Sequence, residues 1–206
     1  MQAAGGNEDK AAQLYLASGL LNVMLLALTN CFEVALRNKI NEYMRETDPD
    51  WLIQLSATNS VLNKLNTIHT YNALKEVRER LSERNRLDNN QMVDGLSFGF
   101  WVSLFLPRQH SDIGDNLVFI FKIEHPRLLY IVQRNINQIR RLRNAIAHNA
   151  PVIFREGTSE VSFERIDLIV NRAIELTEWM EIDPAIYEQY LAQINQQKQA
   201  ILDILG

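Results

Sequence analysis

The feature that most constrains the fold is a long helical pattern near the start of the chain, from Asp9 to Arg45. Apolar side chains recur there every three or four residues, and no proline, nor any glycine after Gly19, interrupts them. The inward positions are Leu21, Met24 or Leu25, Leu28, Phe32, Ala35 or Leu36, and Lys39 or Ile40, and further faces carry Val23, Leu26 and Val34. A helix that is apolar on more than one face should be central and pack on several sides.

The remainder of the chain also has the pattern of helices joined by short loops. With 8 glycines and 5 prolines in 206 residues, it has few of the turn residues that β-sandwiches need. Further helices are expected at Tyr71–Arg86, Ile113–Ile123, Pro126–Asn149, Glu164–Glu181 and Pro184–Leu205, with short helical turns in Trp51–Thr67 and a loop or small hairpin at Val152–Phe163. We therefore expect an all-α protein of one domain over residues 1–206, with a disordered start at residues 1–8 and a C-terminal helix at residues 183–206.

Two glycines stand in an aromatic-rich segment, Met92–Leu106, whose sequence is MVDGLSFGFWVSLFL. Gly95 and Gly99 are four residues apart, so on one continuous helix they would share a face. A glycine inside a helix costs about 1 kcal/mol relative to alanine, so packing should explain both. We predict that another helix approaches closely at this face.

The sequence lacks the motifs of most common enzyme classes. Cys31 is the only cysteine, which excludes an intramolecular disulfide, and its apolar neighbours predict that it is buried. The four histidines are scattered, and no HExxH, CxxC, phosphate-binding loop or GxSxG motif occurs, so we expect no metal and no cofactor. The apolar run Leu20–Leu28 contains Asn22 and is shorter than the roughly 18 residues of a membrane span. Because no signal pattern opens the chain, we expect a cytoplasmic protein without a membrane partner.

The residues that could carry chemistry cluster in Gln133–Pro151, which reads QRNINQIRRLRNAIAHNAP. On a helix the inward stripe comprises Ile136, Ile139, Leu142 and Ile146, and the opposite side comprises Arg134, Asn137, Arg141, Asn144 and His148. Arg143 lies about 40° from Ile139, beside the apolar stripe. A permanent charge there needs a carboxylate or a phosphate as its partner.

The same region is locally basic within a chain of net charge −4. Between Pro126 and Ala150 five arginines and no acidic residue occur, namely Arg127, Arg134, Arg140, Arg141 and Arg143. Such a strip can hold a short stretch of RNA, although it also fits a solvated helix face. The candidate RNA contacts are Arg134, Arg140, Arg141 and Asn149.

An arginine and a histidine can cleave RNA together without a metal ion. Imidazole can remove the proton of a 2′-hydroxyl at neutral pH, and an arginine fork stabilises the charge that develops on the attacked phosphate. The products are a 2′,3′-cyclic phosphate and a 5′-hydroxyl, and DNA is spared because it lacks the 2′-hydroxyl. In a chain this rich in arginine the bare spacing arises roughly once by chance, so His148 also fits a capping or core role.

Four ordered segments together resemble the Abi-like family of abortive-infection proteins in the HEPN superfamily. They are FEVALRNKI at Phe32–Ile40, Trp51, GLSFGFWVSLF at Gly95–Phe105, and RLRNAIAHNAP at Arg141–Pro151, and together they span most of residues 14–180. The family's motif often reads RNRIAHHEP. Here Ala145 replaces a basic residue and Asn149-Ala150 replace His-Glu, while the arginine and the histidine are retained.

The resemblance implies a HEPN-type helical bundle with a long central N-terminal helix and a C-terminal helical extension. It also implies a homodimer that brings two motifs into one cleft, and a metal-independent endoribonuclease of the toxin type. By residue, it implies that His148 is the acid and base, that Arg143 binds phosphate and that Asn144 orients or contacts the substrate. Toxins of this kind usually need a restraining antitoxin, protein or RNA.

Two other interpretations remain open. The chain can be a non-catalytic HEPN module that holds RNA or a protein partner in the same cleft. Alternatively, Arg143 is structural and pairs with Glu33 of the first helix, where Glu33 and Arg37 can also form a local pair. On either view, Glu33 and Arg37 are assigned a supporting role.

Overall fold

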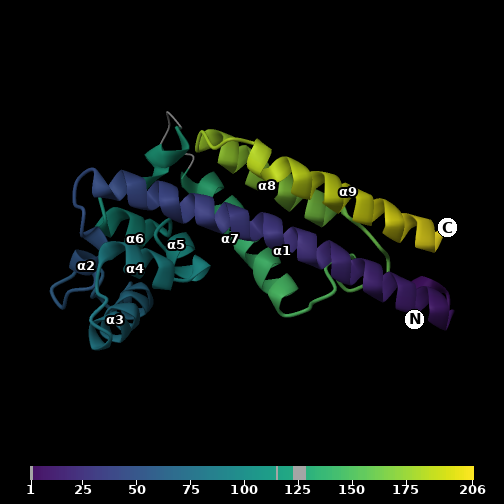
Figure 1. The fold of residues 1–206 in the computed structure, drawn as a ribbon, viewed down its shortest axis with the longest axis horizontal. Coiled ribbons are helices and arrows are strands. Elements are labelled where there is room, and N and C mark those ends of the chain that lie inside the picture. Colours follow the sequence, from purple (N-terminus) through teal and green to yellow (C-terminus); the bar gives the residue numbers. More distant parts are fainter. Residues whose placement is uncertain (1, 115, 123–128) are drawn as a thin grey trace. The chain divides into compact units, whose positions relative to one another are not determined.

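The computed structural model describes residues 2–114, 116–122 and 129–206 (Figure 1). Within these ranges every regular element is a helix, and the one extended pairing is an isolated antiparallel bridge between Phe154 and Val161. The helices are η1 Gln2–Ala4, α1 Glu8–Arg45, α2 Trp51–Leu55, α3 Ile68–Glu83, α4 Asn89–Gly95, α5 Phe98–Ser103, α6 Pro107–Asp112, η2 Leu117–Phe121, α7 Leu129–Ala147, α8 Glu164–Trp179 and α9 Ala185–Leu205. The prediction of an all-α chain with a long first helix and a C-terminal helix is confirmed.

Several predicted helices differ from the structure in their bounds. Helix α3 spans Ile68–Glu83, so it begins and ends three residues before the predicted Tyr71–Arg86. Among the described residues of the segment expected as a helix at Ile113–Ile123, the regular element is the short 3₁₀ helix η2, and Asp115 and Ile123 lie outside the described residues. The predicted start of the next helix, at Pro126 and Arg127, also lies outside them. Its end is confirmed, because α7 stops at Ala147.

Helix α1 is 38 residues long and keeps one stripe of its surface fully buried. Leu21, Leu25 and Leu36 are 0% exposed. Val23 and Val34, predicted on packed faces, are 56% and 42% exposed, and Cys31 is only half-buried. The described elements therefore cover one stripe of α1 and leave an apolar face open to solvent.

By length and composition α1 could cross a membrane, and 28% of its most apolar window is buried. The window is longer than the run Leu20–Leu28 because averaging over a full helix tolerates isolated polar residues such as Asn22. Since the core helix of a soluble protein meets the same criteria, the cytoplasmic location and the absence of a membrane partner stay predictions.

The described chain divides into two compact units, to which α1 and α7 each contribute. Unit 1 contains the chain up to Phe32, Asn137–Glu178 and Ile182–Gly206. Unit 2 contains Glu33–Ile136 and Trp179–Glu181. The expectation of one domain over residues 1–206, with a disordered start, stays a prediction.

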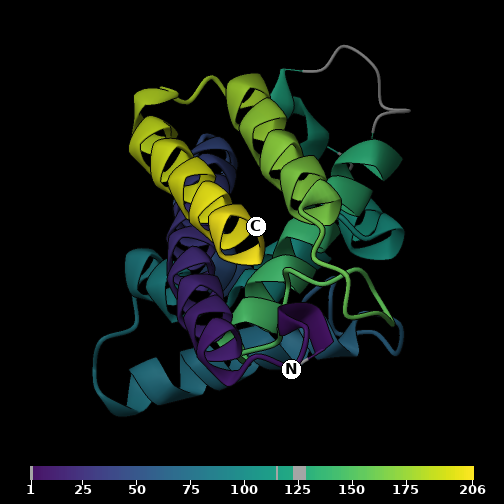
Figure 2. The ribbon, with the colours of Figure 1, turned by 90° about the vertical axis from the view of Figure 1, so that its right-hand side faces the viewer.

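In unit 1 the C-terminal helix α9 is tied to both α1 and α8. Lys10 Nζ donates to the carbonyl oxygen of Leu205 over 2.7 Å, so the end of α9 lies beside the start of α1 (Figure 2). Lys198 Nζ lies 2.5 Å from Asp167 Oδ1 of α8 and 5.4 Å from the centre of the Phe163 ring. The first contact joins α9 to α1, and the others join α9 to α8 and to the residue before it.

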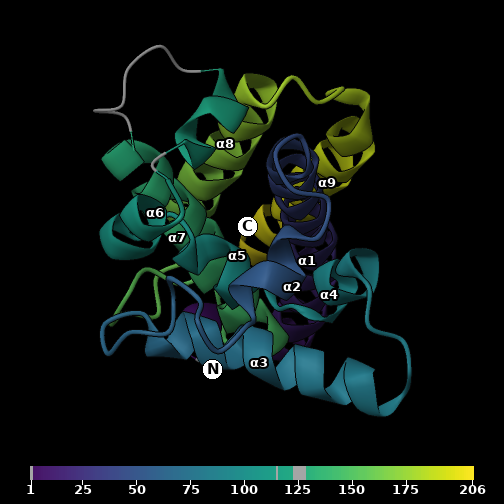
Figure 3. The ribbon, with the colours of Figure 1, turned by 90° about the vertical axis from the view of Figure 1, so that its left-hand side faces the viewer.

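In unit 2 side-chain hydrogen bonds join the end of α1 to α2 and α4. Figure 3 labels these three helices. Asn41 Oδ1 accepts hydrogen bonds from Trp51 Nε1 over 3.0 Å and from Asn89 Nδ2 over 2.9 Å. Asn89 Oδ1 in turn accepts from the Leu52 N–H over 3.1 Å. The buried polar groups of Trp51 and Asn89 thus have partners, as burial requires.

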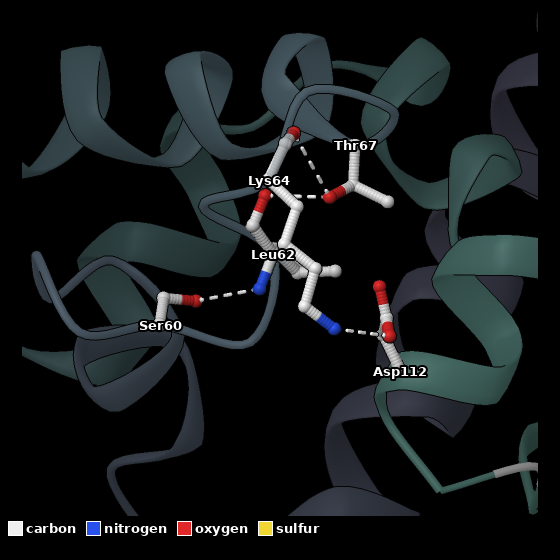
Figure 4. Close-up of polar contacts among 5 residues, drawn as sticks. All are labelled: Ser60, Leu62, Lys64, Thr67 and Asp112. Carbon is white, nitrogen blue, oxygen red and sulfur yellow. Dashed lines mark hydrogen bonds and ion pairs between the residues drawn. The ribbon is translucent and has the colours of Figure 1, made fainter.

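The loop between α2 and α3 is held by its own polar groups and by one ion pair (Figure 4). Thr67 Oγ1 donates to the Leu62 carbonyl over 2.7 Å, and Ser60 Oγ accepts from the Leu62 N–H over 3.1 Å. Lys64 Nζ lies 2.6 Å from Asp112 Oδ1 at the end of α6. These contacts hold the segment in which short helical turns were predicted. In that segment the regular helix is α2, and the rest is a loop.

The two glycines of the aromatic segment do not share one helix face, contrary to prediction. Leu96 and Ser97 have extended backbone angles, so α4 ends at Gly95 and α5 begins at Phe98. A Cβ atom at Gly95 would lie 2.7 Å from Val77 Cγ1, so the close approach of another helix, α3, is confirmed there. At Gly99 the nearest atom would be Ser97 Oγ at 3.5 Å, so none of the described helices approaches closely at that position.

Candidate functional site

The candidate site lies in unit 1, at the C-terminal end of α7. The helix ends where Asn149 takes a left-handed backbone conformation with φ of 56°. The Asn149 N–H donates to the Ile146 carbonyl over 2.9 Å, and the Ala150 N–H donates to the Ala145 carbonyl over 2.8 Å. This pair of bonds is a Schellman cap, in which asparagine is the usual alternative to glycine. The cap leaves His148 as the exposed residue just after the last helical turn.

The inward stripe of α7 is confirmed, and Arg143 lies beside it. Ile139 and Leu142 are at most 1% exposed, whereas Arg143 is half-buried. Arg143 Nη1 donates to Asn144 Oδ1 over 3.4 Å, a long hydrogen bond within the predicted motif. His148 is five positions after Arg143, so the two side chains leave the helix about 140° apart. The guanidinium and the imidazole of one chain therefore point from different sides of α7.

The predicted RNA contacts are not equally available. Arg140 is half-buried and donates from Nε and Nη2 to Asn137 Oδ1, over 3.2 and 2.8 Å. Arg141 is exposed. Arg134 is also exposed but belongs to unit 2, so it is not part of the unit 1 site. Of the arginines predicted to bind RNA or its phosphate, unit 1 therefore contains Arg140, Arg141 and Arg143. Arg141 is exposed, Arg143 is half-buried, and Arg140 is hydrogen-bonded to Asn137.

The two residues assigned a supporting role belong to unit 2. Glu33 and Arg37 are both half-buried on α1. Arg37 Nη2 lies 3.3 Å from Asp94 Oδ1 of α4. The sequence pattern missed this partner because Asp94 is far along the chain. The pairing of Glu33 with Arg143 stays a prediction.

Within the described ranges, no group of three or more histidine, cysteine, aspartate or glutamate side chains could hold a metal ion. The expected absence of a metal and of a cofactor stays a prediction, because it was drawn from motifs alone.

A cavity that the sequence pattern missed adjoins the end of α7 in unit 1. It encloses about 890 Å³, and its walls come from α1 and from the segment that follows α7. Asn149, the residue after His148, lines it together with Tyr15, Asn22 and Phe154. The signals available in the sequence were Tyr15 and Asn22, which stand among apolar residues of the first helix. Neither indicates a cavity until the segment after α7 is placed against α1.

Comparison with known proteins places the candidate site within a described family. The family model for Abi-like proteins matches residues 3–153, a stretch that contains Arg143, Asn144 and His148. No curated protein and no solved structure matches the chain. The link to the HEPN superfamily stays a prediction. Because the match covers more than half of the chain, this protein belongs to the Abi-like family, which suggests an abortive-infection function.

Proposed function

We propose that this protein is a toxin-type endoribonuclease of abortive infection that cleaves RNA without a metal ion. The observation that carries the proposal is the exposed imidazole of His148 at the end of α7, with Arg143 and Asn144 on the preceding turn. Family membership supports it, because the family match includes these three residues. The substrate would be single-stranded RNA, whose phosphates Arg140 and Arg141 can also contact.

In the proposed reaction His148 takes the proton of a 2′-hydroxyl while the 2′-oxygen attacks the adjacent phosphorus. The bond from phosphorus to the 5′-oxygen breaks, and a proton from an imidazolium completes the leaving 5′-hydroxyl. The other product is a 2′,3′-cyclic phosphate. Arg143 binds the phosphate oxygens as their charge grows, and Asn144 orients the guanidinium through the Arg143 Nη1 hydrogen bond.

A homodimer is part of the proposal, because Arg143 and His148 of one chain leave α7 about 140° apart. Two copies of α7 facing each other would let the arginine of one chain and the histidine of the other meet at one phosphate. A protein or RNA antitoxin is also part of the proposal, since an unrestrained ribonuclease would damage the RNA of its own cell.

Induced expression and RNA cleavage by purified protein test the nuclease directly. We expect wild type to arrest growth and to leave 2′,3′-cyclic phosphate and 5′-hydroxyl ends, also in the presence of a chelator. His148→Ala should lower the cleavage rate by about 10²- to 10⁴-fold, the usual contribution of a general acid or base. The matched control is His69→Ala, which removes an exposed histidine of α3 in unit 2 and should cleave like wild type.

Equal cleavage by wild type and His148→Ala would contradict the proposed mechanism. RNA binding without cleavage by wild type would instead support the alternative of a non-catalytic binding module.

A further inference from the structure

We infer that the cavity beside the end of α7 is a binding pocket for a nucleobase of the RNA. The inference rests on the proposed function for the presence of RNA, and it adds where a base adjoining the cleaved phosphate would be held. The cavity volume of about 890 Å³ lies within the range of about 300–1,000 Å³ that is typical of small-ligand sites. It therefore has room for a base together with part of its nucleotide.

The chemistry of the cavity walls fits a base and not a phosphate. None of the described side chains that line it is charged, and its polar groups are hydroxyls and amides, including those of Ser18, Asn22 and Ser159. A phosphate in such surroundings would lose its hydration without gaining a cation. The arginines proposed to contact phosphate lie instead on α7, where Arg141 is exposed and Arg143 half-buried. This division matches a nucleotide, which is neutral at its base and anionic at its phosphate.

Asn22 supplies an acceptor that nothing in the described chain satisfies. Its Oδ1 atom is buried and accepts no hydrogen bond, although the residue lines the cavity. A buried amide oxygen without a donor is unfavourable, so a ligand in the cavity that offers an N–H group would favour a turn of the Asn22 amide toward it. Nucleobases present N–H donors in the plane of the ring, and adenine pairs with an amide through its amino group and N7. The unsatisfied oxygen thus favours a base over a purely apolar occupant.

Two aromatic rings on different segments add surfaces on which a base can stack. Tyr15 of α1 is 79% exposed, and Phe154 of the bridged segment is half-buried, and both line the cavity. Unpaired RNA bases stack on such rings without regard to sequence. Asn149 connects the cavity with the candidate active site, because it lines the cavity and directly follows His148. A base in the cavity would therefore leave its phosphate near the imidazole.

Binding of short RNA to variants of Asn22 tests the pocket. The protein used carries His148→Ala so that it does not cut the probe, and the probes are a fluorescein-labelled oligoadenylate and the same ribose-phosphate chain without bases. Asn22→Leu keeps the size of the side chain and removes its amide, and Tyr15→Ala removes one stacking ring. Asn30→Leu is the matched control, since it makes the same change at an exposed position of α1 that does not line the cavity.

We expect Asn22→Leu to weaken binding of oligoadenylate on the order of tenfold, as loss of a buried hydrogen bond does, and to leave binding of the base-free chain unchanged. Tyr15→Ala should act in the same direction, and Asn30→Leu should bind both probes as the parent does. Equal binding of oligoadenylate by Asn22→Leu and Asn30→Leu would overturn the inference. The inference would also be overturned if Asn22→Leu changed the mass of the protein in solution and left its RNA affinity unchanged. The cavity would then hold a second protein chain.

This binding experiment and the cleavage assay of protein with His148 intact together distinguish failure of the nuclease from failure of the pocket. Protein with His148 intact that never cuts RNA, but still binds bases through Asn22, contradicts the nuclease and supports the pocket. Protein that cuts RNA but is indifferent to Asn22→Leu contradicts the pocket and supports the nuclease.

Discussion

At the scale of single residues, the backbone conformation of Asn149 determines the exposure of His148, the proposed general base. Asn149 has a positive φ and completes the cap of α7, so the chain turns away one residue after His148. A glycine would serve the same cap, whereas a β-branched residue would be strained in the left-handed region. The imidazole is exposed because the helix ends there.

Tyr187 of α9 is a residue whose titration should be visible in the stability of the protein. Burial raises the pKa of Tyr187, the neighbouring Thr177 side chain opposes the shift, and the nearby Cys31 adds to it. A raised pKa in the folded state stabilises the fold below the unfolded value of about 10, and this stabilisation is lost as the pH rises through the folded value. The free energy of unfolding should therefore fall more steeply above about pH 10 for wild type than for Tyr187→Phe.

Urea denaturation at a series of alkaline pH values measures this difference. Tyr130→Phe is the control, because Tyr130 is 67% exposed and its ring loses little water on folding. Parallel stability curves for wild type and Tyr187→Phe would contradict the assigned cause.

At the scale of elements, α4 is a short helix that begins at a side-chain cap and ends where it lies close to another helix. The Asp88 side chain accepts from the Gln91 N–H over 3.0 Å and begins α4 as an N-cap. The helix ends at Gly95, against Val77 of α3, and the extended Leu96 and Ser97 follow. The aromatic segment is thus two short helices instead of one.

The two glycines of this segment make a matched pair of substitutions. Gly95→Ala should destabilise the protein by about 1–3 kcal/mol, because the new methyl group would overlap Val77 unless a helix moves. Gly99→Ala meets no atom within 3.4 Å, so it should be neutral or stabilise by up to about 1 kcal/mol through helix propensity. Chemical denaturation of both variants measures the difference. A Gly95→Ala protein as stable as Gly99→Ala would show that α3 and α4 adapt without cost.

At the scale of the whole molecule, the proposed chemistry requires two chains. Arg143 and His148 leave α7 on different sides, so a site assembled from one chain would need a large bend of the bound RNA. A site in which each chain supplies one of the two groups needs no such bend. We therefore predict that the protein is a dimer in solution and that it cleaves RNA only as a dimer.

Complementation between two inactive variants tests whether the site is shared. We expect sedimentation at micromolar concentration to give the mass of a dimer. Arg143→Ala and His148→Ala should each be inactive alone, whereas a mixture allowed to exchange chains should regain cleavage at the one site that keeps both groups. A strict monomer, or a mixture as inactive as its components, would exclude a site built from two chains.

The sequence alone determined the features that depend on local periodicity. The long helix α1, the amphipathic helix α3 and the buried stripe of α7 follow from apolar residues repeated at helical spacing, and the position of Arg143 beside that stripe follows from its angle. The motif around His148 is recognised instead by its resemblance to the Abi-like family, which the sequence can show because the motif residues are close together along the chain.

Only the tertiary structure decided what joins distant parts of the chain. The contact of Gly95 with α3, the pairing of Arg37 with Asp94 and the cavity lined by Asn22 and Asn149 each bring together residues from different elements. Periodicity along a helix says which side chains turn inward, but it does not say which element they meet. For that reason the sequence could predict a histidine and an arginine as candidate catalytic residues, while the cavity that adjoins the end of α7 became visible only once α1 and the end of α7 were folded into one unit.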